Sequence, residues 1–198
     1  MPPATQALLL TNVAVFLLQS AGGEALVELF ALWPLGSPGP AFGIWQLVTY
    51  SFLHGGIAHI LFNMYALYMF GGDVERLFGS RFFLAYYFAC VVSAALFQLA
   101  VSALVGGPAY PVVGASGAVY GVLLAFGMYF PRRMVMLIIP PIPMQARTFV
   151  VVVGVLELVF GVTGTEAGVA HFAHLGGMLG GWLMIQYRRG GFPFSRPH

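Results

Sequence analysis

Long apolar runs, separated by short stretches rich in Gly, Pro and charged residues, set the pattern of this chain. A helix needs about 20 mainly apolar residues to cross a bilayer, and the runs are of that order. We therefore predict a single membrane domain, 1–198, built as an all-α bundle of six spanning helices. The predicted spans lie at about 5–20, 56–72, 81–104, 115–130, 148–162 and 169–187.

Composition narrows the class of protein further. Of the 198 residues 60% are hydrophobic and 7% are charged, which excludes a water-soluble globular domain. A net charge of +2, with no basic patch interleaved with aromatics, gives no reason to expect a nucleic-acid partner. Cys90 is the single cysteine, so an internal disulfide or cysteine metal cluster is excluded. The first run follows no basic segment, and we expect a retained span rather than a signal peptide.

The basic residues orient the predicted bundle. All 8 are arginines, and arginine collects in cytoplasmic loops. With a cytoplasmic N-terminus, Glu24, Glu28 and Glu166 fall in outer connections. The arginines then fall in inner connections or the C-terminal tail, at Arg76, Arg81, Arg132, Arg133, Arg147, Arg188, Arg189 and Arg196. This pattern predicts a multi-pass protein of the cell (inner) membrane with both termini cytoplasmic.

Polar side chains inside membrane helices are costly, and those present gather near the outer ends of the predicted spans. Ser116 opens the fourth span after a glycine-containing loop, where free backbone N–H groups favour negative charge. His174 lies near the start of the sixth span, which runs in the same direction. Ser116 is therefore a candidate nucleophile and His174 a candidate base, although a serine at this position is also a common helix cap.

Glycines provide a reason for these two helices to meet. Gly117 and Gly121 follow the serine, and Gly177 and Gly181 follow the histidine, each pair at the spacing that allows helices to pack closely in lipid. Packing through these faces would bring the hydroxyl within reach of the imidazole. Glycine stripes also serve packing without catalysis, and that alternative remains open.

Three further side chains complete the predicted site. Tyr120 lies at i+4 from Ser116 and is placed to pack on the imidazole. His59 and Asn63 are one helical turn apart and could donate hydrogen bonds to an oxyanion, or alternatively bond neighbouring helices.

Other polar residues leave alternatives. His171 competes with His174 for the role of base, and His54 could be structural. Glu157 lies inside the fifth span, where a hydrogen-bonded structural role competes with a functional one. No Asp lies on the outer side and no outer Glu is spaced with His174. We therefore expect a Ser-His dyad rather than a triad.

Three motifs resemble, in order and spacing, the signatures of rhomboid proteases: HGGIAHILFN from His54, GASGAVYG from Gly114 and AHLGGMLGG from Ala173. The resemblance implies a minimal six-span bacterial form with Ser116 as nucleophile and His174 as base. It implies Tyr120 as the tyrosine stacked on the base, and His59, Asn63 and the Ser116 N–H as oxyanion donors.

The resemblance implies a serine endopeptidase without metal or cofactor, which cleaves single-span or polytopic membrane proteins in or beside a transmembrane helix. An inactive rhomboid-like protein that binds membrane clients is the alternative. A metal site built on the histidines is a second one, disfavoured because the H-E-x-x-H motif is absent. Trp45-Gln46 departs from the family's Trp-Arg pair, and 161–168 corresponds to a mobile cap over the site.

Overall fold

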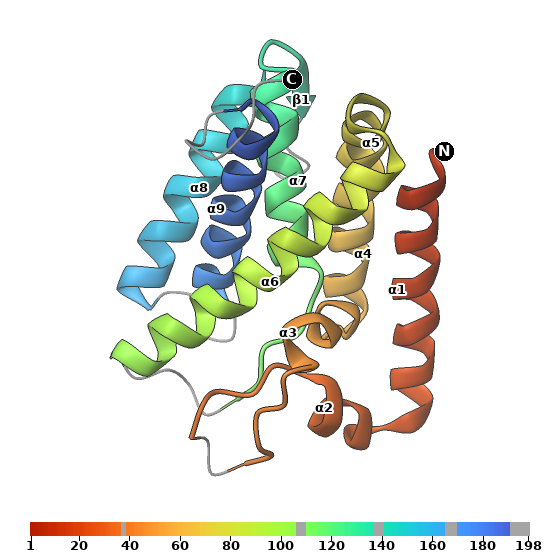
Figure 1. Ribbon diagram of the computed structural model, residues 1–198, viewed down its shortest axis with the longest axis vertical. Helices are drawn as coiled ribbons and strands as arrows, with labels where there is room; N and C mark the ends of the chain where they lie inside the picture. The colour runs from red at the N-terminus through yellow and green to blue at the C-terminus, as the bar shows by residue number, and fades with distance from the viewer. Residues whose placement is uncertain (37–38, 106–109, 137–140, 165–169, 191–198) are drawn as a thin grey trace.

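Helices dominate the structure, a computed structural model that describes residues 1–36, 39–105, 110–136, 141–164 and 170–190 (Figure 1). In chain order the elements are α1 (Pro3–Gly22), α2 (Glu24–Phe30), α3 (Gln46–Thr49), η1 (Tyr50–Phe52), α4 (Ile57–Ala66), η2 (Leu67–Gly71), α5 (Gly72–Phe78), α6 (Ser80–Val105), α7 (Ser116–Tyr129), β1 (Met134–Met136), β2 (Pro143–Gln145), α8 (Ala146–Thr163) and α9 (His171–Arg188). The short antiparallel pair β1–β2 was not predicted, because three-residue strands carry no readable alternation.

The apolar runs of the sequence are helical in the structure. Among the described residues, three helices are long and apolar enough to cross a membrane: Pro3–Gly22, Ser80–Leu104 and Ala146–Thr163. Helix α7 is apolar but shorter, with 14 residues. The predicted start of the last span at 169 lies outside the described residues, and α9 begins at His171. The described residues thus form an all-α membrane protein with a short antiparallel strand pair, β1–β2.

The helix at the second predicted span, 56–72, extends farther than predicted. The helix continues from α4 through a π-helical turn, η2, into α5 and reaches Phe78 rather than 72. Gly71 and Gly72 keep helical φ angles of −61°, and a Cβ on Gly71 would lie 3.3 Å from Thr5. These glycines therefore mark the close approach of α1 and not a helix end. The end comes at Gly79, whose φ of +77° favours glycine.

Helices α7 and α9 lie side by side in Figure 1, and their backbones touch at glycines. A Cβ on Gly177 would overlap the backbone carbonyl of Gly117, and one on Gly121 would lie 3.0 Å from the Gly177 carbonyl oxygen. Such distances exclude any larger side chain without a shift of backbone. The two helices approach as closely as small-residue faces in lipid allow.

The other glycines of the AHLGGMLGG segment of α9 pack against α6. Cβ atoms on Gly176 and Gly180 would lie 3.0 and 3.1 Å from backbone carbonyls of α6, at Ser93 and Ala89. Gly181, which we predicted to face the helix of the serine, has α6 side chains as its nearest neighbours instead. Of the four glycines in the AHLGGMLGG segment, Gly177 thus faces α7, and the other three face α6. This arrangement wedges α9 between α6 and α7.

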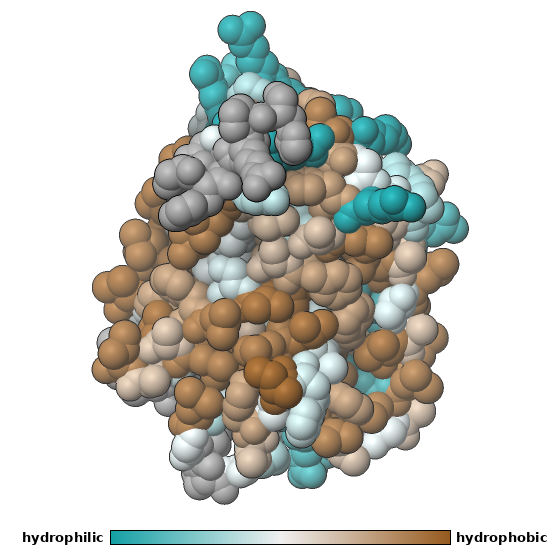
Figure 2. All heavy atoms as spheres, in the orientation of Figure 1, coloured by the Kyte–Doolittle hydropathy of each residue, from teal (hydrophilic) through white to brown (hydrophobic). Residues whose placement is uncertain are grey.

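Charged and apolar surfaces are segregated. Figure 2 shows hydrophilic residues gathered at the upper end of the molecule and a hydrophobic belt below it. At this end Asp73 pairs with Arg76 at 2.5 Å and with Arg133 at 2.6 Å, and the Arg188 guanidinium covers the ring of Phe78. Arg76 and Arg133 come from two predicted inner connections, and Arg188 comes from the predicted C-terminal tail. All three lie at the same end of the molecule, as a prediction that places them on one side of the membrane requires.

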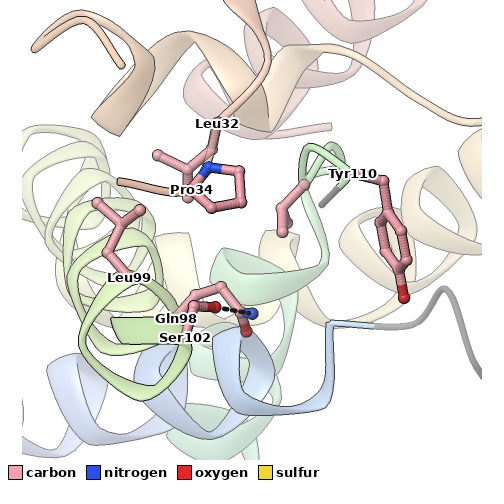
Figure 3. A pocket seen from close by; sticks show the side chains of 7 residues that line it. Leu32, Pro34, Gln98, Leu99, Ser102 and Tyr110 are labelled. Atoms are coloured by element: carbon pink, nitrogen blue, oxygen red, sulfur yellow. Dashed lines mark hydrogen bonds between the residues drawn. The ribbon is translucent and has the colours of Figure 1, made fainter. Parts of the chain in front are cut away.

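The connection from α2 to α3 is held by a buried amide. Gln46 is 1% exposed, and its side-chain oxygen accepts a hydrogen bond from the Trp33 N–H at 3.1 Å while its nitrogen donates to backbone carbonyls. Farther along, Leu32 pairs with Val112 through two backbone hydrogen bonds. A pocket beside this bridge, lined by Leu32, Pro34, Gln98, Leu99, Ser102, Tyr110 and Val112, is shown in Figure 3.

Gly177→Ala should lower thermal stability sharply, because the added methyl group meets backbone that cannot rotate away. Overpacking of this kind costs about 1–3 kcal/mol or more. Gly154→Ala on α8 is the matched control, since its Cβ would meet only the flexible end of Met178 at 3.4 Å. Thermal unfolding in detergent compares the two variants. Equal melting temperatures would contradict close α7–α9 contact.

Candidate active site

The site is built on the first turns of α7 and α9. Ser116 is the first residue of α7, and the preceding Ala115 is its N-cap, so the serine is free of the capping role that the sequence left open. Its Oγ lies 2.8 Å from Nε2 of His174, although the two residues are 58 positions apart. This distance is within the range in which a hydroxyl can transfer its proton to an imidazole.

A strained glycine shapes the approach to the serine. Gly114 has φ +122° and donates its N–H to the Tyr50 carbonyl at 3.0 Å. A Cβ at Gly114 would lie 2.7 Å from the Nε2 of His59 and 3.7 Å from the Oγ of Ser116. The space that a side chain would fill is thus the space between the histidine and the serine. Glycine is needed here for both its backbone conformation and its lack of a side chain.

His59 and Asn63 of α4 present unused donors. The Gly55 N–H donates to Nδ1 of His59 at 3.3 Å, which leaves the ring proton on Nε2, the atom nearest Gly114. Asn63 is 6% exposed, and its Nδ2 makes no hydrogen bond to any described residue. A buried amide without a partner is unusual and calls for a functional or solvent explanation. Both groups fit the predicted role of oxyanion donors.

Tyr120 packs on the imidazole as the i+4 spacing suggested. Its ring and that of His174 are stacked, with centroids 4.3 Å apart and planes at 4°. Because both rings are largely shielded from solvent, the stack restricts the rotation of the imidazole. The tyrosine hydroxyl donates to an Oε1 oxygen of Glu157.

Glu157, for which the sequence left a structural and a functional role open, lies beside both histidines of α9. Its Oε2 lies 2.8 Å from Nδ1 of His174 and 2.7 Å from Nδ1 of His171. The contact with His174 is close but poorly aligned for a hydrogen bond. The expected Ser-His dyad included no carboxylate, and in the structure α8 places one beside the base. No spacing in the sequence relates these two helices.

Comparison with known proteins identifies the family. The model of the Rhomboid domain matches residues 41–190, which include the serine, both α4 donors and the α9 histidines. The chain belongs to the rhomboid family.

Several characterised rhomboids resemble this chain. Rhomboid protease GluP of Bacillus subtilis is 34% identical over 141 residues, which cover 70% of this chain and 25% of that protein. Rhomboid protease GlpG of Klebsiella pneumoniae is 38% identical over 78 residues, covering 39% of this chain and 28% of the relative. GlpG of Photorhabdus laumondii is 29% identical over 185 residues, covering 92% and 60%. The match thus spans about a quarter of the length of the first two relatives.

His54 of this rhomboid lies behind the site. Its ring contacts His59 edge-on, with centroids 5.2 Å apart, and Gln19 of α1 bonds its backbone N–H and carbonyl. Burial lowers the pKa of His54 to about 4, with a further contribution from His59, so the ring is neutral at the pH of the cell. The bonds from Gln19 hold the His54 backbone, while its two ring nitrogens make no hydrogen bond to any described residue, so its structural role stays a prediction. The predicted cap, 161–168, extends into 165–169, which lie outside the described residues.

Asn63→Leu should leave the thermal stability of the rhomboid unchanged or raise it, because the variant removes a buried donor that has no partner. Gln46→Leu is the matched control: it removes an equally buried amide that is fully bonded, and leaves the Trp33 N–H unpaired. The expected cost there is about 1–3 kcal/mol. Thermal unfolding of both variants tests the contrast, and a large loss of stability in Asn63→Leu would show that its amide is a structural tie.

Proposed function

We propose that this rhomboid is an intramembrane serine endopeptidase that cleaves peptide bonds in or next to transmembrane helices of substrate membrane proteins. The observation that carries the proposal is the 2.8 Å contact between Ser116 Oγ and His174 Nε2, made between the first turns of α7 and α9. A hydroxyl at this distance from an imidazole is the arrangement of an activated nucleophile. The relatives named as rhomboid proteases support the same class of reaction.

The reaction follows from the positions of the two groups. His174 Nε2 accepts the proton of Ser116 as Oγ attacks the carbonyl carbon of the scissile bond, and a tetrahedral intermediate forms. The imidazolium then gives its proton to the leaving amine, and an acyl-enzyme remains on Ser116. Water, deprotonated by the same imidazole, releases the acid product and restores the serine.

The negative charge of the tetrahedral intermediate meets three donors in this proposal. They are Nε2–H of His59, Nδ2–H of Asn63 and the backbone N–H of Ser116 at the start of α7. The first turn of a helix leaves such N–H groups without intrahelical partners and carries a partial positive charge. Each side-chain donor of this kind contributes about 10²-fold or more to the rate.

The proposed topology has six spans, with both termini cytoplasmic and the site toward the outer face of the cell membrane. The arginine-rich end supports this orientation, since α7 and α9 run from the site toward it in Figure 1. Substrates would be single-span or polytopic membrane proteins. A stable helix hides its carbonyls, so a substrate must be loosened locally at the scissile bond. The reaction as proposed uses neither a metal nor a cofactor.

Ser116→Ala and His174→Ala should each abolish cleavage of a model single-span substrate by the purified chain in detergent. A fluorophosphonate probe should label Ser116 in the unaltered protein, as read by peptide mapping, and the label should be lost in His174→Ala. Ser20→Ala is the control, because the Ser20 hydroxyl bonds only to its own helix, at the Phe16 carbonyl. Cleavage that persists in Ser116→Ala would refute the proposal. Absence of both cleavage and labelling in the unaltered protein would favour a client-binding rhomboid-like protein.

A further inference from the structure

The carboxylate of Glu157 is the polar group of α8 that reaches the proposed site. It is 7% exposed, whereas α8 otherwise buries only Ala146 and Val150 among its residues. An acidic residue within a membrane helix costs about 2.5–3.5 kcal/mol on insertion scales and is tolerated where it meets partners. Glu157 meets three of them: Tyr120, His171 and His174.

The three partners of Glu157 do not all contact the same oxygen of its carboxylate. Tyr120 donates its hydroxyl to Oε1, while both histidines approach Oε2 with Nδ1, at 2.7 Å from His171 and 2.8 Å from His174. An ionised carboxylate accepts hydrogen bonds and donates none. His171 Nδ1 makes a hydrogen bond to Oε2, whereas His174 Nδ1 is at ion-pair distance without hydrogen-bond alignment. A negative charge 2.8 Å from Nδ1 nevertheless favours, by charge attraction, the ring tautomer that carries the proton on that atom.

That tautomer has a consequence for Ser116. A neutral imidazole with its proton on Nδ1 has a lone pair on Nε2, and Nε2 is the atom that faces Ser116 Oγ at 2.8 Å. With the proton on Nε2 instead, the ring would be unable to accept the serine proton. A carboxylate at Nδ1 also stabilises the imidazolium that forms when the proton has moved.

We propose that Glu157 is a positioning residue that turns the Ser116–His174 pair into a triad, with His171 and Tyr120 holding its carboxylate in place. The inference rests on the proposed function, because it concerns the base of that reaction. It departs from the dyad that the sequence led us to expect. The three members come from three helices, α7, α8 and α9.

The same carboxylate could instead have only a structural role, as a clasp, meaning a polar contact that holds α8 against the other helices. The two roles differ in which measured properties a change of Glu157 would affect. A clasp affects thermal stability and substrate binding, and leaves the ring tautomer of His174 as it was. A positioning residue affects kcat and the tautomer.

Glu157→Gln should lower kcat by about 10²-fold, the size of a general-base contribution, with KM within about twofold of the unaltered protein. Glu157→Asp should recover part of the loss, since it restores the charge. Leu158→Ala is the matched control on α8, because this exposed neighbour lies away from the site. Kinetics on a model single-span substrate and thermal unfolding are measured together. Unchanged kcat in Glu157→Gln, or a loss wholly in KM with lower stability, would overturn the proposal.

Nitrogen NMR of the unaltered chain, labelled at histidine, supplies a test that needs no folded Glu157 variant. Neutral His174, assigned by comparison with His174→Ala, should carry its proton on Nδ1, and a neutral ring protonated on Nε2 would overturn the inference. The outcomes are separable from those of the proposed function. Cleavage that needs Ser116 but is indifferent to Glu157→Gln removes only the triad.

The two histidines and Glu157 also form a possible ligand set for a divalent metal, with ligand atoms within 4.8 Å of one another. A metal bound at the Nδ1 atoms would displace the protons that the positioning role requires. Cleavage should therefore persist after dialysis against EDTA. Loss of cleavage on dialysis, with recovery on adding Zn²⁺, would assign the cluster to a metal and overturn the proposal.

Discussion

The contact between the backbones of α7 and α9 is the constraint on which the site depends. Gly177 lies against the carbonyl of Gly117. Gly117 directly follows Ser116 in α7, and Gly177 comes one turn after His174 in α9. Helices with larger residues at these positions would be held farther apart, and the serine and histidine would separate with them. Hydrogen-bonding distance between Oγ and Nε2 thus follows from the absence of two side chains. In lipid, where the hydrophobic effect does not drive helices together, such close packing also supplies much of their association.

The position of the site along the bundle follows from the same two helices. Both α7 and α9 carry their reactive residue in the first turn and end among the arginines at the other end of the molecule. The site therefore lies at the end of these two helices that is farther from the arginines. A hydrolytic centre in this place has to hold its polar groups by packing and by one another, because lipid offers them no hydrogen bonds.

Sequence alone located the helices, and it singled out most of the side chains that lie together around Ser116 and His174, because both leave local signals. The small-residue spacing after Ser116 and His174 is readable in any single helix, and so is the i+4 relation of Tyr120. The role of Gly71 and Gly72 was missed, since a glycine that admits a neighbouring helix looks the same in sequence as one that ends its own. The approach of Glu157 to His174 was missed for a related reason. It depends on how far α8 is rotated about its axis, and no motif records that angle.

Two buried amides differ in whether the folded protein pairs their donors. Gln46 is surrounded by partners and orders a connection, whereas Asn63 keeps a buried donor without a partner among the described residues. An unpaired buried donor costs about 1–3 kcal/mol. Under the proposed function, the oxyanion of the tetrahedral intermediate would pair with the Asn63 amide during the reaction. Glu157 is the opposite case, a charge that is fully surrounded before any substrate arrives. In the proposed reaction the oriented base would move the proton, and the open donors would stabilise the oxyanion, so the two conditions would serve different parts of the same chemistry.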